Sequence, residues 1–204
     1  MKRWIAAIVA LMVMASVSWG LLTFYLVDNF EDGTFSKWTA FDNAKLSLLK
    51  NPKLPKRDLV QESCGEYALE VQGAAKDWYV GGVSTNLSVN AADYSRFSID
   101  VNGIKAGKIK IELYQDDNKT GEIEQDVNNA WKATSDSIWS IEIPIIKNGY
   151  TRYSLPLTAF AHANPGIGSD KLGGAPILKM QAIFIASEKE GSVDCAVDNM
   201  MFTY

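Results

Sequence analysis

The stretch Arg96-Phe97-Ser98-Ile99-Asp100-Val101-Asn102-Gly103 decides the fold class, because apolar and polar residues alternate along it until a turn signal ends it. A period of two residues places every second side chain on one face of a β-strand, whereas an α-helix needs a period near 3.6. The dipeptide Asn102-Gly103 is typical of turns. Shortly afterwards, the run Lys108-Ile109-Lys110-Ile111-Glu112-Leu113-Tyr114 repeats the alternation. Both segments therefore predict strands, the first with Phe97, Ile99 and Val101 on one face.

The same period continues through most of the chain. Further strands are predicted at residues 24–27, 38–41, 45–49, 67–71, 78–83, 138–146, 149–157, 180–186 and 193–202. Only residues 122–131 are a weak helix candidate, since their Val, Asn and Thr content disfavours a helix. Long loops are expected at residues 115–137 and 161–176. Many short strands separated by Gly, Asn and Pro indicate an all-β sandwich, here a single domain over residues 21–204.

The N-terminus carries the features of an export signal. Lys2-Arg3 precede an apolar run over residues 4–15, and the small-residue stretch Ser16-Val17-Ser18-Trp19-Gly20 follows. These are the three parts of a secretory signal peptide, which would occupy residues 1–20. The alternative is an uncleaved membrane anchor that extends to about residue 27, because the apolar character continues that far. Either interpretation places the domain outside the cell, in the periplasm or in the cell envelope.

The composition narrows the class of protein. The 204 residues are 47% hydrophobic and 22% charged, which is ordinary for a globular domain. A net charge of −4 argues against a nucleic-acid partner, which requires a basic face. The two cysteines, Cys64 and Cys195, are expected to form a disulfide in an exported protein. The alternative is that both are buried free thiols.

No pattern in the sequence predicts a catalytic site. His162 is the only histidine, and it lies in a Gly/Pro-rich loop, whereas a catalytic triad also needs a placed nucleophile. Glu122, Glu124 and Asp126 would have to satisfy the carboxylate separation of a glycosidase, and a solvated charged loop explains them more simply. We therefore expect a protein that is not an enzyme, with a glycoside hydrolase or lyase as an alternative.

The order of several segments resembles the carbohydrate-binding-module jelly rolls, which have a galactose-binding-like fold. These segments are residues 28–33 with Trp38, then residues 65–71, 94–101, 141–144, 153–157 and 197–200. In that family, the first strand often ends in a Phe-Glu-acidic-Gly turn, and the last strand carries an Asp-Asn pair. The resemblance implies a jelly roll of two antiparallel sheets that binds carbohydrate. The stretch Gly81-Gly82-Val83-Ser84 is also similar to one in the complex I intermediate-associated protein 30 group, which shares this sandwich.

The resemblance further implies a structural calcium ion where the first turn meets the last strand. Glu31 and Asp198 match the ligand positions, with Asp28 or Asp32 as a further ligand. Calcium prefers several carboxylate and carbonyl oxygens, which this turn and strand can supply. The alternative is that Glu31 and Asp32 are solvated and that Asp198 ends a strand.

Sugar recognition combines flat aromatic faces with a few polar groups. Aromatic residues at predicted strand ends or in loops are the candidate platforms, and polar residues near them are the candidate partners of sugar hydroxyls. The candidate ligand-binding residues are Tyr79, Tyr114, Gln115, Asp117, Trp131 and Arg152. For each aromatic residue the alternative is a place in the core, which Trp38 is expected to take.

The sequence thus predicts an exported protein that binds an extracellular or cell-surface polysaccharide without catalysis. The alternative is a structural or assembly protein of the cell envelope that uses the sandwich to bind another protein.

Overall fold

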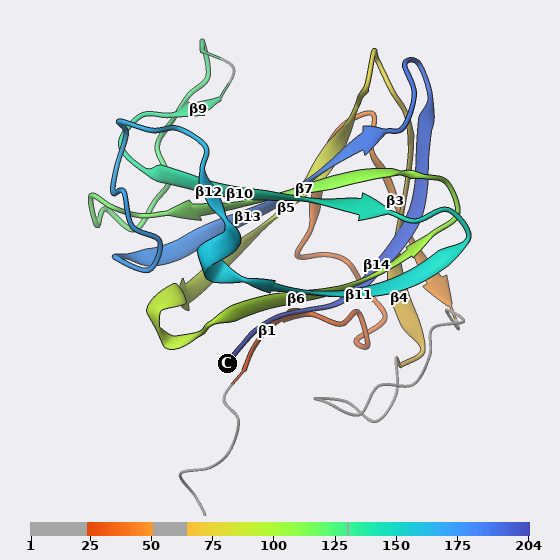
Figure 1. Ribbon diagram of the computed structural model, residues 1–204, viewed down its shortest axis with the longest axis horizontal. Helices are drawn as coiled ribbons and strands as arrows, with labels where there is room; N and C mark the ends of the chain where they lie inside the picture. The colour runs from red at the N-terminus through yellow and green to blue at the C-terminus, as the bar shows by residue number, and fades with distance from the viewer. Residues whose placement is uncertain (1–23, 51–64, 130) are drawn as a thin grey trace, which may run out of the picture.

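The computed structural model of the protein describes residues 24–50, 65–129 and 131–204, which fold into a β-sandwich (Figure 1). Sheet A has the order β11 (Gly149–Pro156), β6 (Arg96–Gly103), β14 (Ser192–Thr203), β4 (Tyr67–Ala74), β3 (Lys45–Lys50), and β1 (Tyr25–Asp28) also pairs with β14. Sheet B has the order β12 (Ala161–His162), β10 (Ser137–Ile145), β7 (Gly107–Gln115), β13 (Pro176–Ala186), β5 (Tyr79–Asn90), β2 (Thr39–Asp42). The pairings in both sheets are antiparallel, which confirms the prediction of an all-β jelly-roll sandwich.

Shorter elements complete the fold. The strands β8 (Gln125–Asp126) and β9 (Lys132–Ala133) form a small hairpin, and the 3₁₀-helices η1 (Ala91–Asp93) and η2 (Leu157–Ala159) follow β5 and β11. Within the described ranges, none of the helices is long and apolar enough to cross a membrane.

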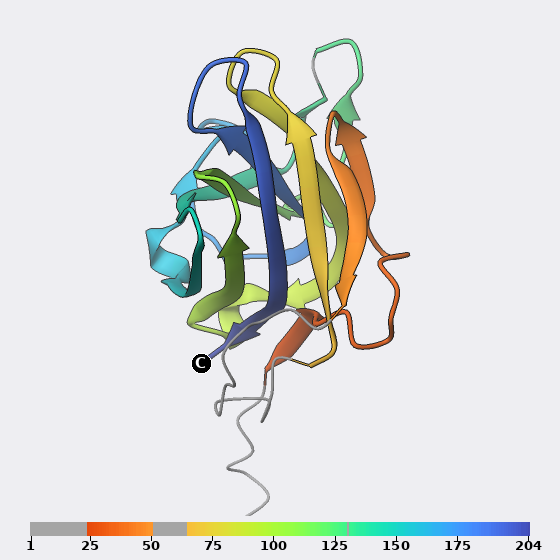
Figure 2. The same cartoon turned by 90° about the vertical axis from the view of Figure 1, so that its right-hand side faces the viewer.

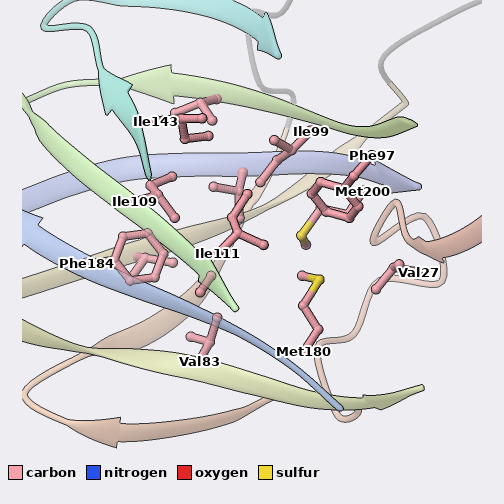
Figure 3. Close-up of a cluster of buried hydrophobic side chains, with 14 of the residues drawn as sticks. Val27, Val83, Phe97, Ile99, Ile109, Ile111, Ile143, Met180, Phe184 and Met200 are labelled. Carbon is pink, nitrogen blue, oxygen red and sulfur yellow. The ribbon is translucent and has the colours of Figure 1, made fainter. Parts of the chain in front are cut away.

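Side chains from both sheets fill the space between them, as Figure 3 shows. The alternation noted in the sequence decides which side chains enter this core: Phe97 and Ile99 point inward from β6, and Ile109 and Ile111 point inward from β7. All four are fully buried. Burial of each such side chain contributes about 1.5–3 kcal/mol, so the alternating pattern both specifies the sheet faces and holds them together.

The first and last strands of the described chain pair, as the resemblance implies. Tyr25 of β1 lies opposite Phe202 of β14, and Figure 2 shows the two strands side by side near the C-terminus. Residues 25–27, which the anchor hypothesis included, are therefore part of the sandwich. The proposed cleavage site and the rest of the signal or anchor segment lie outside the described residues.

The predicted weak helix at residues 122–131 is wrong, because this segment forms the β8–β9 hairpin. Asp126 explains the difference: its side chain accepts a hydrogen bond from the backbone N–H of Asn128, at 2.9 Å. The Asp126 carbonyl also accepts from the N–H groups of Asn129 and Trp131. Short polar side chains that bond the nearby backbone in this way favour turns over helices.

Of the two cysteines in the predicted disulfide, only Cys195 lies within the described residues. Cys195 is fully buried on β14, and burial raises the pKa of its thiol. Cys64 lies outside the described residues, so the disulfide stays a prediction.

Candidate functional site

The outer face of sheet B carries a cleft of about 720 Å³. Since alternate residues of β7, β13 and β5 point into the core, the residues between them point outward. Glu112 on β7 lies opposite Gln181 on β13, which lies opposite Ser84 on β5. Two residues after Glu112 on β7, Tyr114 lies opposite Lys179 on β13. The floor of this sheet B cleft is therefore a polar row that crosses three strands.

Aromatic side chains line the cleft. Tyr79 and Trp131 expose 40% and 62% of their surface, whereas Tyr114 is buried in the cleft floor. Phe41 of β2 forms part of the wall beside β5, where a Cβ at Gly82 would lie only 2.4 Å from its ring. The absence of a side chain at Gly82 thus permits this close approach. The structure brings together all three aromatic residues predicted from the sequence: Tyr79, Tyr114 and Trp131.

The two tyrosine hydroxyls are fixed by carboxylates. The Tyr79 hydroxyl donates to Asp42 Oδ2 at 2.5 Å. The Tyr114 hydroxyl lies 2.9 Å from Glu112 Oε2 and 2.9 Å from Gln181 Oε1. Burial and the neighbouring carboxylates raise the pKa of both tyrosines, so their hydroxyls keep their protons at neutral pH.

The cleft also contains an ordered ion pair. Lys110 Nζ lies 2.7 Å from Glu112 Oε1, so Glu112 is held between an ammonium group and a tyrosine hydroxyl. Each of the two Glu112 carboxylate oxygens therefore has a partner that fixes its position.

Two predicted partners of sugar hydroxyls, Gln115 and Asp117, do not line the cleft. The Gln115 side chain is fully buried and donates to Asp117 Oδ1 at 2.7 Å and to the Lys171 carbonyl at 3.1 Å. Asp117 accepts from the backbone N–H groups of Ser137 and Ser169, and these bonds lower its pKa although burial opposes them. Both residues instead hold the two long loops together.

Arg152, the third predicted partner, belongs to the other sheet. It lies on β11 and binds both oxygens of the buried Asp100 through its Nε and Nη2 atoms, each at 2.7 Å. The cross-strand register places it opposite Asp100, and it does not line the sheet B cleft.

The sequence did not single out Glu112, Gln181, Lys179 and Gln125 as cleft residues. The available signal was their outward position on alternating strands near Tyr114. The cross-strand register that aligns β5, β7 and β13 was not readable from the sequence, and neither was the hairpin that brings Gln125 close.

A second cavity of about 640 Å³ lies between η1, η2 and the loop that contains Asp170. Of its aromatic side chains, Trp139 and Phe160 are buried, and only Tyr94 is half-buried. His162 stacks on Trp139, with ring centroids 4.9 Å apart, and its Nδ1 lies 3.3 Å from Asp170 Oδ1. The single histidine of the chain therefore packs away from the sheet B cleft.

The predicted calcium ligands Glu31 and Asp198 lie near enough for the charge of one to affect the other. Asp198 is fully buried, and burial together with the charges of Asp100 and Glu31 raises its pKa to about 8. The neighbouring Asn199 Oδ1 is also buried, with no hydrogen-bond partner among the described residues. A β-bulge in β14 after Asp198 and the left-handed φ of 47° at Asn199 interrupt the regular alternation of the strand at these two residues.

The other two predicted ligands are engaged in turns. Asp28 accepts from the Phe30 backbone N–H and from Trp38 Nε1, each at 2.9 Å, while Asp32 is exposed and accepts from Thr34. Trp38 is buried, as expected. In the described ranges, no three Asp, Glu, His or Cys side chains form a metal-binding group. An ion at Asp198 would also need amide, carbonyl or water oxygens.

Structural comparison identifies the fold. The family 11 carbohydrate-binding module from Clostridium thermocellum, in complex with a β-1,3-1,4-mixed-linked tetrasaccharide, matches with a TM-score of 0.54 and 16% identity, over 90% of this chain and 97% of that chain. The fold is that of a carbohydrate-binding-module jelly roll. A family 11 module of a cellulosomal cellulase of the same organism matches this jelly roll with a TM-score of 0.53 and 17% identity, over 90% and 96% of the two chains. An exo-β-agarase matches it with a TM-score of 0.54 and 10% identity, over 88% of this chain and 25% of that chain.

A scan with protein-family models finds no match to the sequence, and a comparison with curated proteins finds none either.

Proposed function

We propose that the protein is a non-catalytic glycan-binding protein whose sheet B cleft receives a polysaccharide chain. One observation carries this proposal: the exposed rings of Tyr79 and Trp131 line the same cleft as the polar row of Glu112, Gln181 and Ser84. Aromatic faces beside a few fixed polar groups are what a sugar ring requires. The jelly-roll likeness to a module in complex with a tetrasaccharide supports it.

Each part of the cleft has a separate role in this proposal. The rings of Tyr79 and Trp131 stack on the C–H faces of sugar units, and Glu112 and Gln181 bond the sugar hydroxyls. Because Tyr114 and Lys110 already fix Glu112, the carboxylate needs no rearrangement when a sugar arrives. Groups fixed in advance reduce the ordering cost of binding.

We expect the cleft to bind a glycan without hydrolysing it. Glycoside hydrolysis needs a pair of carboxyl groups that flank the scissile bond. Glu112 and Asp42 line the cleft, but neighbouring side chains already engage them: Lys110 and Tyr114 bond Glu112, and Tyr79 bonds Asp42. These contacts suit fixed hydrogen-bond partners of sugar hydroxyls.

Affinity electrophoresis against a panel of soluble polysaccharides, with mixed-linked β-glucan included, tests the proposal. The double variant Tyr79→Ala/Trp131→Ala should migrate freely in a gel that retards the original protein. Trp78→Ala is the matched control, because Trp78 is 51% exposed and does not line the cleft. Retardation of no protein by any polysaccharide, or equal retardation of all three, would contradict the proposal.

We also propose a structural calcium ion held by Asp198, Glu31 and the amide oxygen of Asn199. The unpartnered Asn199 oxygen and the crowding of carboxyl groups around Asp198 support it, since a cation would relieve both. Glu31 already accepts from the backbone N–H groups of Glu66 and Tyr67, at 2.9 and 3.0 Å, so it would contribute its remaining lone pairs. Calcium titration followed by mass spectrometry under native conditions tests the stoichiometry.

Export of the protein, by a cleaved signal peptide of residues 1–20, completes the proposal. N-terminal sequencing of the mature protein tests it, with a start at residue 19 or 21 expected. An intact N-terminus in the membrane fraction would instead favour the envelope protein that binds a protein partner.

A further inference from the structure

Lys179 connects the floor of the sheet B cleft to its wall. Its ammonium group lies 5.1 Å from the centroid of the Tyr114 ring and donates to Gln125 Oε1 at 2.8 Å. Gln125 Nε2 in turn donates to the carbonyl of Trp131 at 2.6 Å. A continuous chain of contacts therefore runs from the buried Tyr114 to the exposed Trp131.

The wall that this chain reaches is the β8–β9 hairpin. Figures 1 and 2 show the hairpin standing away from the body of the sandwich. An isolated two-stranded hairpin is only marginally stable in water, so its position depends on contacts with the rest of the fold. At its base, Asp136 Oδ2 accepts from the Glu124 backbone N–H at 3.3 Å, which is a long and weak bond. The contact of Lys179 with Gln125 holds the hairpin from the cleft side.

Trp131 itself has a backbone that needs support. Its φ of 57° lies in the left-handed region, which is strained for a bulky residue. The hydrogen bonds of its N–H to Asp126 and of its carbonyl to Gln125 stabilise this conformation. If Gln125 is released, the carbonyl loses one of these bonds and the ring loses its fixed direction.

Lys179 is well placed to exert this control. Lys179 is half-buried and lines the cleft, where burial lowers its pKa and the charge of Glu112 opposes that effect. A partly buried ammonium group makes stronger hydrogen bonds than one in bulk water.

We propose that Lys179 is a positioning residue that, through Gln125, fixes the distance of Trp131 from the tyrosine floor and thereby sets the glycan affinity of the cleft. This inference rests on the proposed glycan-binding function, but the position of the hairpin is measurable without a glycan.

The experiment compares Lys179→Met, Gln125→Ala, the double variant, and Lys179→Arg as the matched control. Lys179→Met keeps the length of the side chain and removes its donors, whereas Lys179→Arg keeps a cationic donor. Isothermal titration calorimetry with the oligosaccharide of the retarding polysaccharide measures affinity. Hydrogen exchange of the backbone amides of residues 122–134, without glycan, measures how stably the hairpin is held in place. Fluorescence quenching of Trp131, taken as the difference from Trp131→Phe, reports on its ring.

We expect Lys179→Met and Gln125→Ala each to weaken binding about tenfold, and the double variant to weaken it no further, because both remove the same connection. Exchange and quenching should rise in all three, while Lys179→Arg stays within about threefold of the original affinity. Two results would overturn the proposal. One is a loss of affinity in the double variant equal to the product of the two single losses, and the other is a loss of affinity with unchanged exchange and quenching. In either case Lys179 would act by contacting the sugar directly. If no glycan binds, the proposed function fails, and unchanged exchange in Lys179→Met and Gln125→Ala would separately overturn the positioning role.

Discussion

Replacement of Trp131 by alanine should weaken glycan binding about 25-fold and leave stability nearly unchanged. Trp131 is 62% exposed, so with roughly 250 Å² for a whole tryptophan side chain about 150 Å² of it faces solvent. A sugar ring stacked on one face covers roughly half of that area, about 75 Å². At about 25 cal/mol per Å², this contact contributes about 2 kcal/mol, which corresponds to the stated change in affinity.

Isothermal titration calorimetry measures the affinity, and urea unfolding measures the stability. The free energy of unfolding should change by less than about 0.5 kcal/mol, because an exposed side chain contributes little to the core. Trp78→Ala removes a ring of similar exposure outside the cleft and should leave the affinity unchanged. A loss of less than twofold in Trp131→Ala, or an equal loss in Trp78→Ala, would refute the reasoning.

Three further outcomes follow from particular side chains. Arg152→Ala leaves the buried Asp100 without its bidentate partner, so the free energy of unfolding should fall by about 3–5 kcal/mol. Glycan affinity of the folded protein should not change. A weakened affinity would mean that Arg152 belongs to the binding site. Because the folded-state pKa values of Tyr79 and Tyr114 are raised, their stabilising contribution is present below the ordinary value of 10.0 and is lost as pH rises through the folded-state values. Ultraviolet titration should therefore show one late-ionising tyrosine fewer in Tyr79→Phe and in Tyr114→Phe than in the original protein, and loss of an early-ionising tyrosine instead would contradict this. Calcium should raise the unfolding temperature of the original protein by several degrees and that of Asp198→Asn by much less. Scanning calorimetry with and without a chelator measures both effects. Equal effects on the two proteins would contradict the assignment of the ion to Asp198.

The sequence predicted the sheets well because their signal is local. Each alternating segment, such as residues 96–101, carries the information about which side chains share a face, so Phe97, Ile99 and Val101 enter the core together. The pairing of the first and last strands also followed, from the acidic turn after Val27 and the Asp198-Asn199 pair. Residues 122–131 failed because the competing turn depends on one side chain, Asp126, whose bond to the backbone the helix scale does not weigh.

The candidate site was predicted in part, for the same physical reason. Trp131, Tyr79 and Tyr114 were recognised one at a time, as large aromatic residues at the ends of strands, and the fold brings them into one cleft. Their polar neighbours depend on the register between strands that are far apart in the sequence. Gln115 illustrates the difficulty: it is adjacent to Tyr114, but a one-residue step in a strand places it on the opposite face.

The most direct test of glycan binding at the sheet B cleft is nuclear magnetic resonance of the isotope-labelled protein, titrated with the oligosaccharide that binds best. The account predicts shift changes concentrated at outward-facing residues of β5, β7 and β13, around Ser84, Glu112 and Gln181, and along the β8–β9 hairpin. Changes confined to the second cavity, around Tyr94 and Leu172, or none with any oligosaccharide, would contradict it.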